Sequence, residues 1–186
     1  MIDSEHLVLR KLKFSDIDDL VEQGNDYDVH YYGFFLMKYP FTKEEAVLVV
    51  KEEDHVKNLK RFGIELKDAP VLHSCQNQES SPARGKIIGV TDLYNINLKS
   101  RKLKVGYWIG KNYRRKGYAN EAVKKVIKYA FANYDIDEII ATTLTDNDPS
   151  MNLLVKNGFV RGKILKNDRF FEGKYMDSVQ FVLKRK

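Results

Sequence analysis

The segment from residue 102 to residue 144 constrains the fold of this chain more than any other. The stretch 102–110 predicts a β-strand, and the β-branched stretch 138–144 predicts a second one. Because two strands joined by a helix form a crossover unit, we expect them to be parallel neighbours in one sheet. Between them, apolar residues recur at the spacing of one helix face: Ala119, Ala122, Val123, Val126, Ile127, Ala130 and Phe131.

Positive charge is concentrated where this helix begins. Arg114, Arg115 and Lys116 precede Gly117, which stands just before the helical stretch. A helix N-terminus presents free backbone N–H groups and a partial positive charge, so the segment suits a polyanion, most simply a pyrophosphate. Taken alone, a basic helix N-terminus with a glycine is equally compatible with a solvated turn, and that alternative stays open at this point.

The rest of the chain predicts a mixed sheet of the α/β (α+β) class with helices on both faces. A capping box at 42–45 should start a helix that continues to about Leu59. We expect Asp148 to cap a short helix that ends at Gly158, and a further short helix to begin near Asp16. Strands are expected at 7–10, 61–66, 86–94, 159–165 and 175–183.

Length and composition fit a single domain over 1–186, with a flexible polar loop at 68–85. The chain has one cysteine, Cys75, so it can form no intrachain disulfide, and no apolar run is long enough to cross a bilayer. We therefore expect a cytoplasmic protein. The four histidines are scattered without ligand spacing, so we expect no metal site.

The net charge of +6 is distributed unevenly along the chain. Residues 15–28 contain six acids and no Lys or Arg, whereas residues 99–128 contain eleven cations and one acid, Glu121. Two solvated faces would account for this pattern. The alternative is a cationic site for an anionic ligand beside an acidic rim for a cationic substrate. Nucleic-acid binding ranks last, because an anion site already accounts for the cations.

Three motifs together resemble the GNAT family of N-acetyltransferases. The family signature R/Q-x-x-G-x-G/A follows VGYWIG at 105–110 and falls on Arg114, Gly117 and Ala119. The sequence NDPS at 147–150 is similar to the family's N-x-x-S…K-x-G-F helix, with later matches at Leu153, Lys156, Gly158 and Phe159. The sequence GKYMD at 173–177, with LVLR at 7–10, looks like the ribosomal-protein N-terminal (Rim-like) branch. The resemblance covers nearly the whole chain except the loop at 68–85.

This resemblance implies the acyl-CoA N-acyltransferase fold, a mostly antiparallel mixed sheet with a central parallel strand pair flanked by helices. It implies that an amine attacks the thioester of acetyl-CoA directly. In the family, the strand matching 107–109 splays from its parallel neighbour and binds the pantetheine arm, while the loop matching 114–119 binds the pyrophosphate. The expected cofactor-binding residues are Tyr107, Trp108, Ile109, Arg114, Arg115, Lys116, Gly117, Tyr118, Ala119, Asn147 and Ser150.

Two catalytic positions depart from the family pattern. Leu154 stands where many relatives have a proton-donating tyrosine, and Lys104 stands where relatives often have a glutamate base. The resemblance makes Ser150 the expected partner of the departing thiolate, with a purely structural role in the first helical turn as the alternative. Asp92, on the adjacent strand, is the candidate general base, and the alternative is a surface carboxylate.

The absence of a glutamate base at position 104 affects which class of acceptor amine we expect. Near neutral pH, deprotonation costs under ~1 kcal/mol for an α-amine and ~4 kcal/mol for a lysine amine. With the Rim-like resemblance, this favours a ribosomal or other protein N-terminus. The alternatives are a small amine, such as a polyamine or aminoglycoside, and a catalytically idle acyl-CoA-binding domain. The candidate acceptor-binding residues are Tyr31, Tyr32 and Phe34, with a place in the core as the alternative. We expect a monomer or homodimer.

Overall fold

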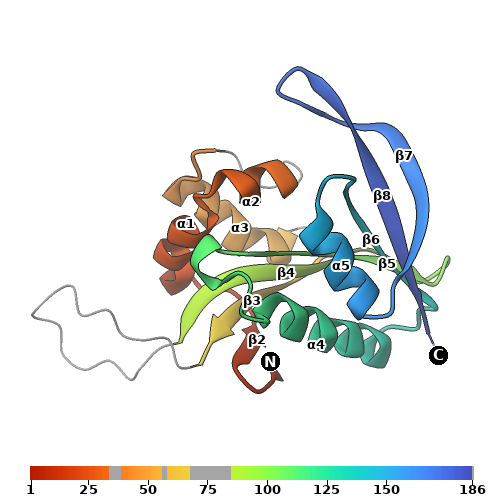
Figure 1. The fold of residues 1–186 in the computed structure, drawn as a ribbon. Coiled ribbons are helices and arrows are strands. Elements are labelled where there is room, and N and C mark those ends of the chain that lie inside the picture. The colour runs from red at the N-terminus through yellow and green to blue at the C-terminus, as the bar shows by residue number, and fades with distance from the viewer. Residues whose placement is uncertain (34–38, 56–57, 68–84, 186) are drawn as a thin grey trace, which may run out of the picture.

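The structure, a computed structural model, describes residues 1–33, 39–55, 58–67 and 85–185. An eight-stranded sheet runs through this part of the chain (Figure 1). Its strands are β1 Ile2–Asp3, β2 Leu7–Arg10, β3 Lys60–Leu66, β4 Lys86–Asn97, β5 Lys102–Ile109, β6 Glu138–Leu144, β7 Val160–Phe171 and β8 Lys174–Lys184. They lie in the order β1-β2-β3-β4-β5-β6-β8-β7, and β5–β6 is the parallel pair. The predicted mixed sheet and its central parallel pair are confirmed.

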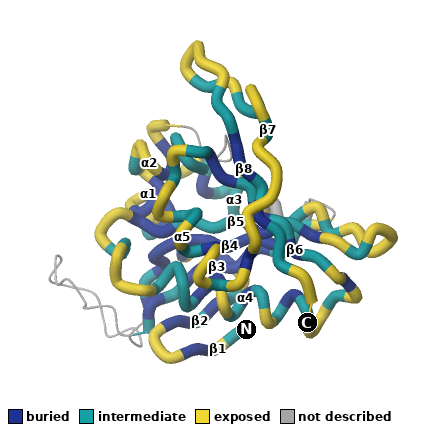
Figure 2. Tube along the Cα trace, turned by 45° about the vertical axis from the view of Figure 1, so that its right-hand side comes forward, coloured by how far each residue is buried: buried dark blue, intermediate teal, exposed yellow. Residues whose placement is uncertain are grey.

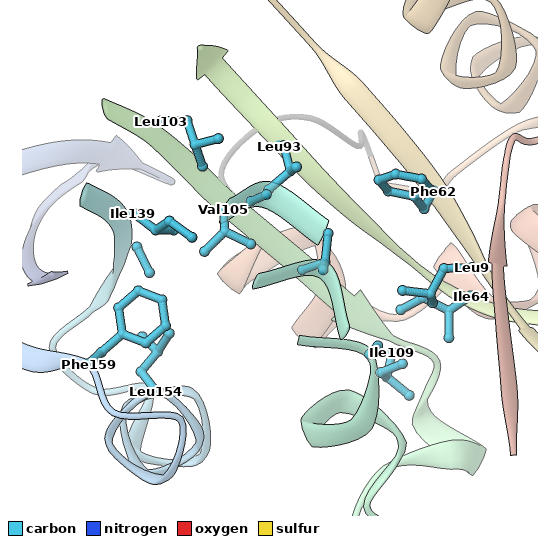
Figure 3. Close-up of a cluster of buried hydrophobic side chains, with 14 of the residues drawn as sticks. Leu9, Phe62, Ile64, Leu93, Leu103, Val105, Ile109, Ile139, Leu154 and Phe159 are labelled. Atoms are coloured by element: carbon cyan, nitrogen blue, oxygen red, sulfur yellow. The ribbon is translucent and has the colours of Figure 1, made fainter. Parts of the chain in front are cut away.

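Helices cover both faces of this sheet. They are α1 Ile17–Gly24, α2 Tyr27–Tyr32, α3 Lys43–His55, α4 Tyr118–Asn133 and α5 Asp148–Lys156. On one face, Leu20 of α1 and Val50 of α3 pack with Val90 of β4. On the other, Val126 of α4 and Leu154 of α5 join the larger core cluster, which Figure 3 shows spread across β2, β3, β4, β5 and β6. The crossover helix α4 therefore occupies the place that its apolar stripe predicts.

The β7–β8 hairpin is longer than the two strands expected at its place. Its pairing continues to Phe171 and Lys174, and the turn between them consists of Glu172 and Gly173. Both turn residues have positive φ, 45° and 81°, as tight hairpin turns require. The hairpin projects from the body of the molecule (Figure 1), and its outer part is largely exposed (Figure 2). This projection carries the turn toward the aromatic side chains of α2.

Two points in the helices differ from the prediction. Helix α2 is not among the expected helices, because its six residues are too short to show a clear period. The described part of α3 runs from Lys43 to His55, and Asn58, with φ 63°, already lies beyond the helix. The cap of α5 is Asn147 rather than Asp148, since the Oδ1 atom of Asn147 accepts the Ser150 amide at 3.2 Å. This three-residue spacing from cap to amide is the usual geometry of a helix N-cap.

Two expectations concern residues that the structure does not describe. They are the polar loop, of which 68–84 lie outside the described residues, and the acceptor-binding candidate Phe34. Within the described ranges, no helix is long and apolar enough to span a membrane. The same ranges hold no group of three or more His, Cys, Asp or Glu side chains that could bind a metal ion.

Candidate functional site

The parallel strands β5 and β6 pair over part of their length and then diverge. Pairing runs from Lys102–Glu138 to Lys104–Ile140, while β5 continues to Ile109. The N–H of Gly110 donates to the Ile88 carbonyl on the β4 side, at 2.8 Å. Because successive residues of a strand direct their backbone groups to opposite edges, residues 107 and 109 face the gap that opens toward β6. The structure therefore contains the splayed strand pair that the family resemblance implies.

The loop between β5 and α4 presents backbone amides at the open end of this gap. Gly117 caps α4 in the left-handed region, with φ 89°, and Arg115 also has positive φ, 61°. Among the described residues, no backbone carbonyl is found to accept a bond from the amides at 116–119. A Cβ placed on Gly117 would meet nothing within 4 Å, so the space in front of the loop is open. Free amides in such a turn form an anion-binding concavity.

Arg114 does not direct its guanidinium toward this concavity. Its Nε donates to the Ile109 carbonyl at 3.0 Å, which covers one backbone group at the edge of the gap. Its terminal nitrogens bind the carboxylates of Asp26 and Asp28. The Arg114 side chain is thus engaged by acids and by a backbone carbonyl, and its contribution of charge to an anion stays a prediction. Arg115 and Lys116 are exposed, and the Lys116 ammonium lies 5.6 Å from the centre of the Tyr113 ring.

The carboxylates of the acidic stretch at 15–28 are engaged by partners within the molecule. Each of its six carboxylates has a polar partner from another part of the chain, so the expected acidic rim does not exist as a set of unpaired charges. The pairs are Asp16–Arg10, Asp18–Lys43, Asp19 with the Ile87 amide, Glu22–Lys86, Asp26–Arg114 and Asp28–Arg114.

Ser150 links α5 to the splayed strand β5. Its Oγ lies 2.9 Å from the Oη of Tyr107. Its backbone amide makes the cap bond to Asn147, so the structural and chemical roles proposed for this residue use different atoms. Burial raises the pKa of the Tyr107 phenol to about 12, and the Ser150 hydrogen bond lowers it by less. Tyr107 therefore keeps its proton at neutral pH and can act as a donor.

Asp92 is buried, with 8% of its surface exposed, so the alternative of a surface carboxylate is wrong. Both of its oxygens accept hydrogen bonds from Arg61, at 2.9 and 2.8 Å. Arg61 also donates to the Val49 carbonyl of α3 at 3.0 Å. Both carboxylate oxygens of Asp92 are therefore engaged by one guanidinium through charge-assisted hydrogen bonds. The role of Asp92 as a base thus stays a prediction, with an ion pair as its competing function.

Tyr31 and Tyr32 are the two candidates for binding the acceptor amine that the structure describes, and their surroundings differ. The Tyr31 hydroxyl donates to Asp146 at 2.9 Å, and its ring lies 5.4 Å from the ring of Phe171 at the tip of the hairpin. Burial, followed by the bond to Asp146, raises the pKa of Tyr31 to about 12. Tyr32 is half-buried, and its ring packs edge-on against Tyr31 at 4.8 Å.

Comparison with known proteins identifies the family. The family model described as "Acetyltransferase (GNAT) domain" matches residues 6–160. The chain belongs to the GNAT acetyltransferase family. It is 26% identical over 184 residues to an uncharacterized N-acetyltransferase, p20, of Bacillus licheniformis, covering 97% of this chain and 93% of that protein.

Solved structures of GNAT proteins share the whole fold. A GNAT acetyltransferase from Bacillus anthracis superimposes with a TM-score of 0.79 at 23% identity, covering 98% of this chain and 97% of the other. A spermidine N-acetyltransferase from Vibrio cholerae, solved with CoA and spermine, gives a TM-score of 0.77 at 21% identity and covers 97% and 96%. The fold prediction is confirmed, and the protein is an acetyl-CoA-dependent N-acetyltransferase.

The residues of this GNAT domain fit acetyl-CoA. The amides at 116–119, the open space before Gly117 and the unpaired half of β5 offer backbone donors and acceptors of the kind that the pyrophosphate and the pantetheine arm require. Leu154 is 1% exposed and belongs to the core, and its side chain has no proton to donate.

Sequence reasoning missed one part of this site, the contact between α2 and the hairpin tip. Tyr27 donates to Glu172 at 2.9 Å, and the His30 ring lies 5.1 Å from Phe171. The aromatic concentration at 27–41 and the Phe170–Phe171 pair were the available signals, but neither reveals that the two segments meet. Tyr27 and Glu172 are 145 residues apart in the sequence, yet they are in contact in the fold.

Proposed function

We propose that this GNAT acetyltransferase modifies the α-amino group of a protein or peptide N-terminus. The observation that carries the proposal is the internal pairing of the acidic stretch at 15–28. A polyamine carries several separated charges and needs several carboxylates that are free to bind it. A peptide N-terminus brings one ammonium, which loses its proton cheaply near neutral pH.

Two residues of the strands, Lys104 and Asp92, support the same class of acceptor amine. Lys104 of β5 cannot serve as a base while it is charged, and the Asp92 carboxylate is engaged by Arg61. A site with a weak base suits an amine whose pKa lies near ~8 far better than one near ~10.4. Similarity to the ribosomal-protein-serine acetyltransferase of Escherichia coli, 23% identical over half of this chain, agrees with this choice.

In the proposed reaction, the chain supplies binding, orientation and hydrogen bonds. The amides at 116–119 neutralise the pyrophosphate, and the edge of β5 at Tyr107 and Ile109 orients the pantetheine arm. The amine nitrogen forms its bond to the acetyl carbonyl carbon, and the carbon–sulfur bond breaks with its electron pair on sulfur. The amine loses one proton and the CoA sulfur gains one. Ser150 donates a hydrogen bond to the departing thiolate.

A small polyamine is the second candidate, and a separate observation favours it. Burial raises the pKa of Tyr32, and negative charge from Asp146, Asp28 and Asp148 raises it further. Asp146 and Asp148 are exposed and lie on the α5 side of Tyr32. Spermidine N(1)-acetyltransferase of Vibrio cholerae is 25% identical over 51% of this chain. These two carboxylates could hold a second ammonium of a polyamine.

An acceptor screen with acetyl-CoA, following release of the CoA thiol, tests the proposal. The panel contains a lysine-free peptide with a free α-amine, an Nα-blocked peptide of the same length with one lysine, spermidine and an aminoglycoside. We expect the first peptide to give the highest kcat/KM. Faster acetylation of spermidine, lost in Asp146→Asn and Asp148→Asn, would establish the second candidate. Acetyl-CoA binding without turnover on any amine would instead indicate an idle domain.

A further inference from the structure

The contact between Tyr107 and Ser150 joins the two elements that border the gap. Tyr107 lies on the unpaired half of β5, and Ser150 lies in the first turn of α5, which follows β6. Their hydroxyl oxygens are 2.9 Å apart in a part-buried setting, across 43 residues of sequence. The pair therefore stands at the mouth of the splayed strands, where the reactive end of the pantetheine arm is proposed to lie.

We propose that Tyr107 is a positioning residue for catalysis, whose phenol donates to Ser150 Oγ and thereby directs the Ser150 hydrogen toward the CoA sulfur. This inference rests on the proposed roles of the β5 edge and of Ser150, and it does not depend on which amine is the acceptor. It gives a reason for the hydrogen bond between the buried phenol and Ser150, and it assigns Tyr107 a side-chain role in addition to its backbone.

The direction of the hydrogen bond follows from the chemistry of the two hydroxyls. A phenol is a stronger donor than an aliphatic alcohol, and the alcohol oxygen is the better acceptor. We therefore assign the donor role to the Tyr107 phenol, one of the two directions that the 2.9 Å contact allows. Burial raises the pKa of Tyr107 to about 12, so the phenol keeps its proton at neutral pH and stays available as the donor.

Without Tyr107, the Ser150 hydroxyl could donate its hydrogen bond to a backbone carbonyl of its own helix. Serine in the first turns of a helix can donate back to a carbonyl three or four residues earlier, which would turn its hydrogen inward. A bond accepted from Tyr107 occupies one lone pair of Ser150 Oγ, restricts rotation of the hydroxyl and polarises it. The Ser150 hydrogen is then better placed to stabilise negative charge on sulfur than that of an isolated serine.

The arrangement also compensates for Leu154. Since Leu154 is buried in the core, α5 offers no phenol of its own at that position. Tyr107 supplies a phenol from the opposite side of the gap, through Ser150. No net proton leaves Tyr107: the electron pair of the broken carbon–sulfur bond rests on sulfur, Ser150 donates a hydrogen bond to it, and the proton that the amine releases reaches the sulfur through solvent.

The pKa of the bound CoA thiol tests this inference without any acceptor. CoA is bound to the protein and titrated by the ultraviolet absorbance of its thiolate, in the wild type, Tyr107→Phe, Ser150→Ala and the double variant. If the pair stabilises the thiolate, Ser150→Ala should raise the thiol pKa by about one unit, and Tyr107→Phe by about half as much. The double variant should match Ser150→Ala, because Tyr107 acts through Ser150.

Controls separate this role from packing. Tyr129→Phe removes a hydroxyl on α4 from a ring that contacts Phe62 of β3, and it should leave the thiol pKa unchanged. Desulfo-CoA, which lacks the sulfur, should bind all variants with the wild-type Kd. An unchanged thiol pKa in Tyr107→Phe, or a further shift when Tyr107→Phe is added to Ser150→Ala, overturns the inference. Neither result would bear on the acceptor screen, so failure of the two proposals is distinguishable.

Discussion

The guanidinium of Arg114 lies 2.8 Å from the carboxylate of Asp28, and it binds Asp26 and the Ile109 carbonyl as well. This one side chain therefore ties the amide loop before α4 to the N-terminus of α2. The neighbouring cations therefore differ: Arg114 connects the two sides of the site, whereas Arg115 and Lys116 are exposed.

Substituting Arg114 by Ala should reduce stability more than cofactor binding. It leaves Asp26 and Asp28 unpaired, and because Asp28 is half exposed we expect a loss of about 1–2 kcal/mol in the free energy of unfolding. Arg115→Ala should show the reverse, a weaker Kd for acetyl-CoA with unchanged stability. Urea denaturation and calorimetry measure the two quantities. A large loss of acetyl-CoA affinity in Arg114→Ala at wild-type stability would place its guanidinium on the pyrophosphate instead.

The sequence separation between interacting residues explains why the sequence predicts the amide loop better than it predicts the contacts of Arg114 and Asp92. The amide loop is a local structure, which a positive-φ glycine and the phase of the following helix define within a few residues. Arg114 meets acids that precede it by 86 and 88 residues, and Asp92 meets Arg61 across 31. Contacts at such separations are set by the order of strands in the sheet, which local periodicity does not report.

Gly117→Asp should nearly abolish acetyl-CoA binding. The residue has φ 89°, and the aspartate carboxylate would enter the open space where the pyrophosphate is proposed to lie. Gly117→Ala should cost roughly 1 kcal/mol of stability from its left-handed backbone. Gly173→Ala is a matched control, because Gly173 also has positive φ and open space but lies at the hairpin tip. Equal acetyl-CoA affinities in Gly117→Asp and the wild type would refute the placement of the pyrophosphate.

Asp92→Asn should destabilise the protein, whether or not Asp92 is a base. Removing one partner of a buried ion pair costs about 3–5 kcal/mol, because Arg61 would be left buried and uncompensated. The double variant Arg61→Leu, Asp92→Leu should recover much of this stability. Its pH–rate profile then decides the chemical role: wild-type turnover in the stable double variant would exclude Asp92 as the base, whereas a lost acidic limb would support it.

Ser150→Ala and Asn147→Ala should separate chemistry from capping. Ser150→Ala keeps the backbone amide that bonds to Asn147, so we expect near-normal stability and acetyl-CoA affinity with a lower kcat. Asn147→Ala removes the cap and should cost about 1 kcal/mol in the free energy of unfolding. Steady-state kinetics and thermal melts report the two effects. A wild-type kcat for Ser150→Ala would reduce this residue to a structural role.

The pH dependence of stability should contain a contribution from Glu121, which lies in the first turn of α4. Burial raises the pKa of this carboxyl, but hydrogen bonds from Ser4 and His6 outweigh it, and the net effect lowers the pKa below its ordinary 4.5. The His6 amide donates at 2.9 Å, and a ring nitrogen of His6 lies 3.0 Å from the other oxygen. These contacts fasten the segment before β2 to the helix that begins at the amide loop.

The sign of the effect follows from this lowered pKa. The ionised form is favoured in the folded state, so its contribution is complete above the unfolded pKa of about 4.5 and is lost as the pH falls through the folded value. Wild type should therefore exceed Glu121→Gln in free energy of unfolding at pH 7, by about 1 kcal/mol after solvent screening. The difference should disappear toward pH 3. His6→Ala, which keeps the His6 amide, should lose less, and a pH-independent gap would assign the effect to packing rather than to charge.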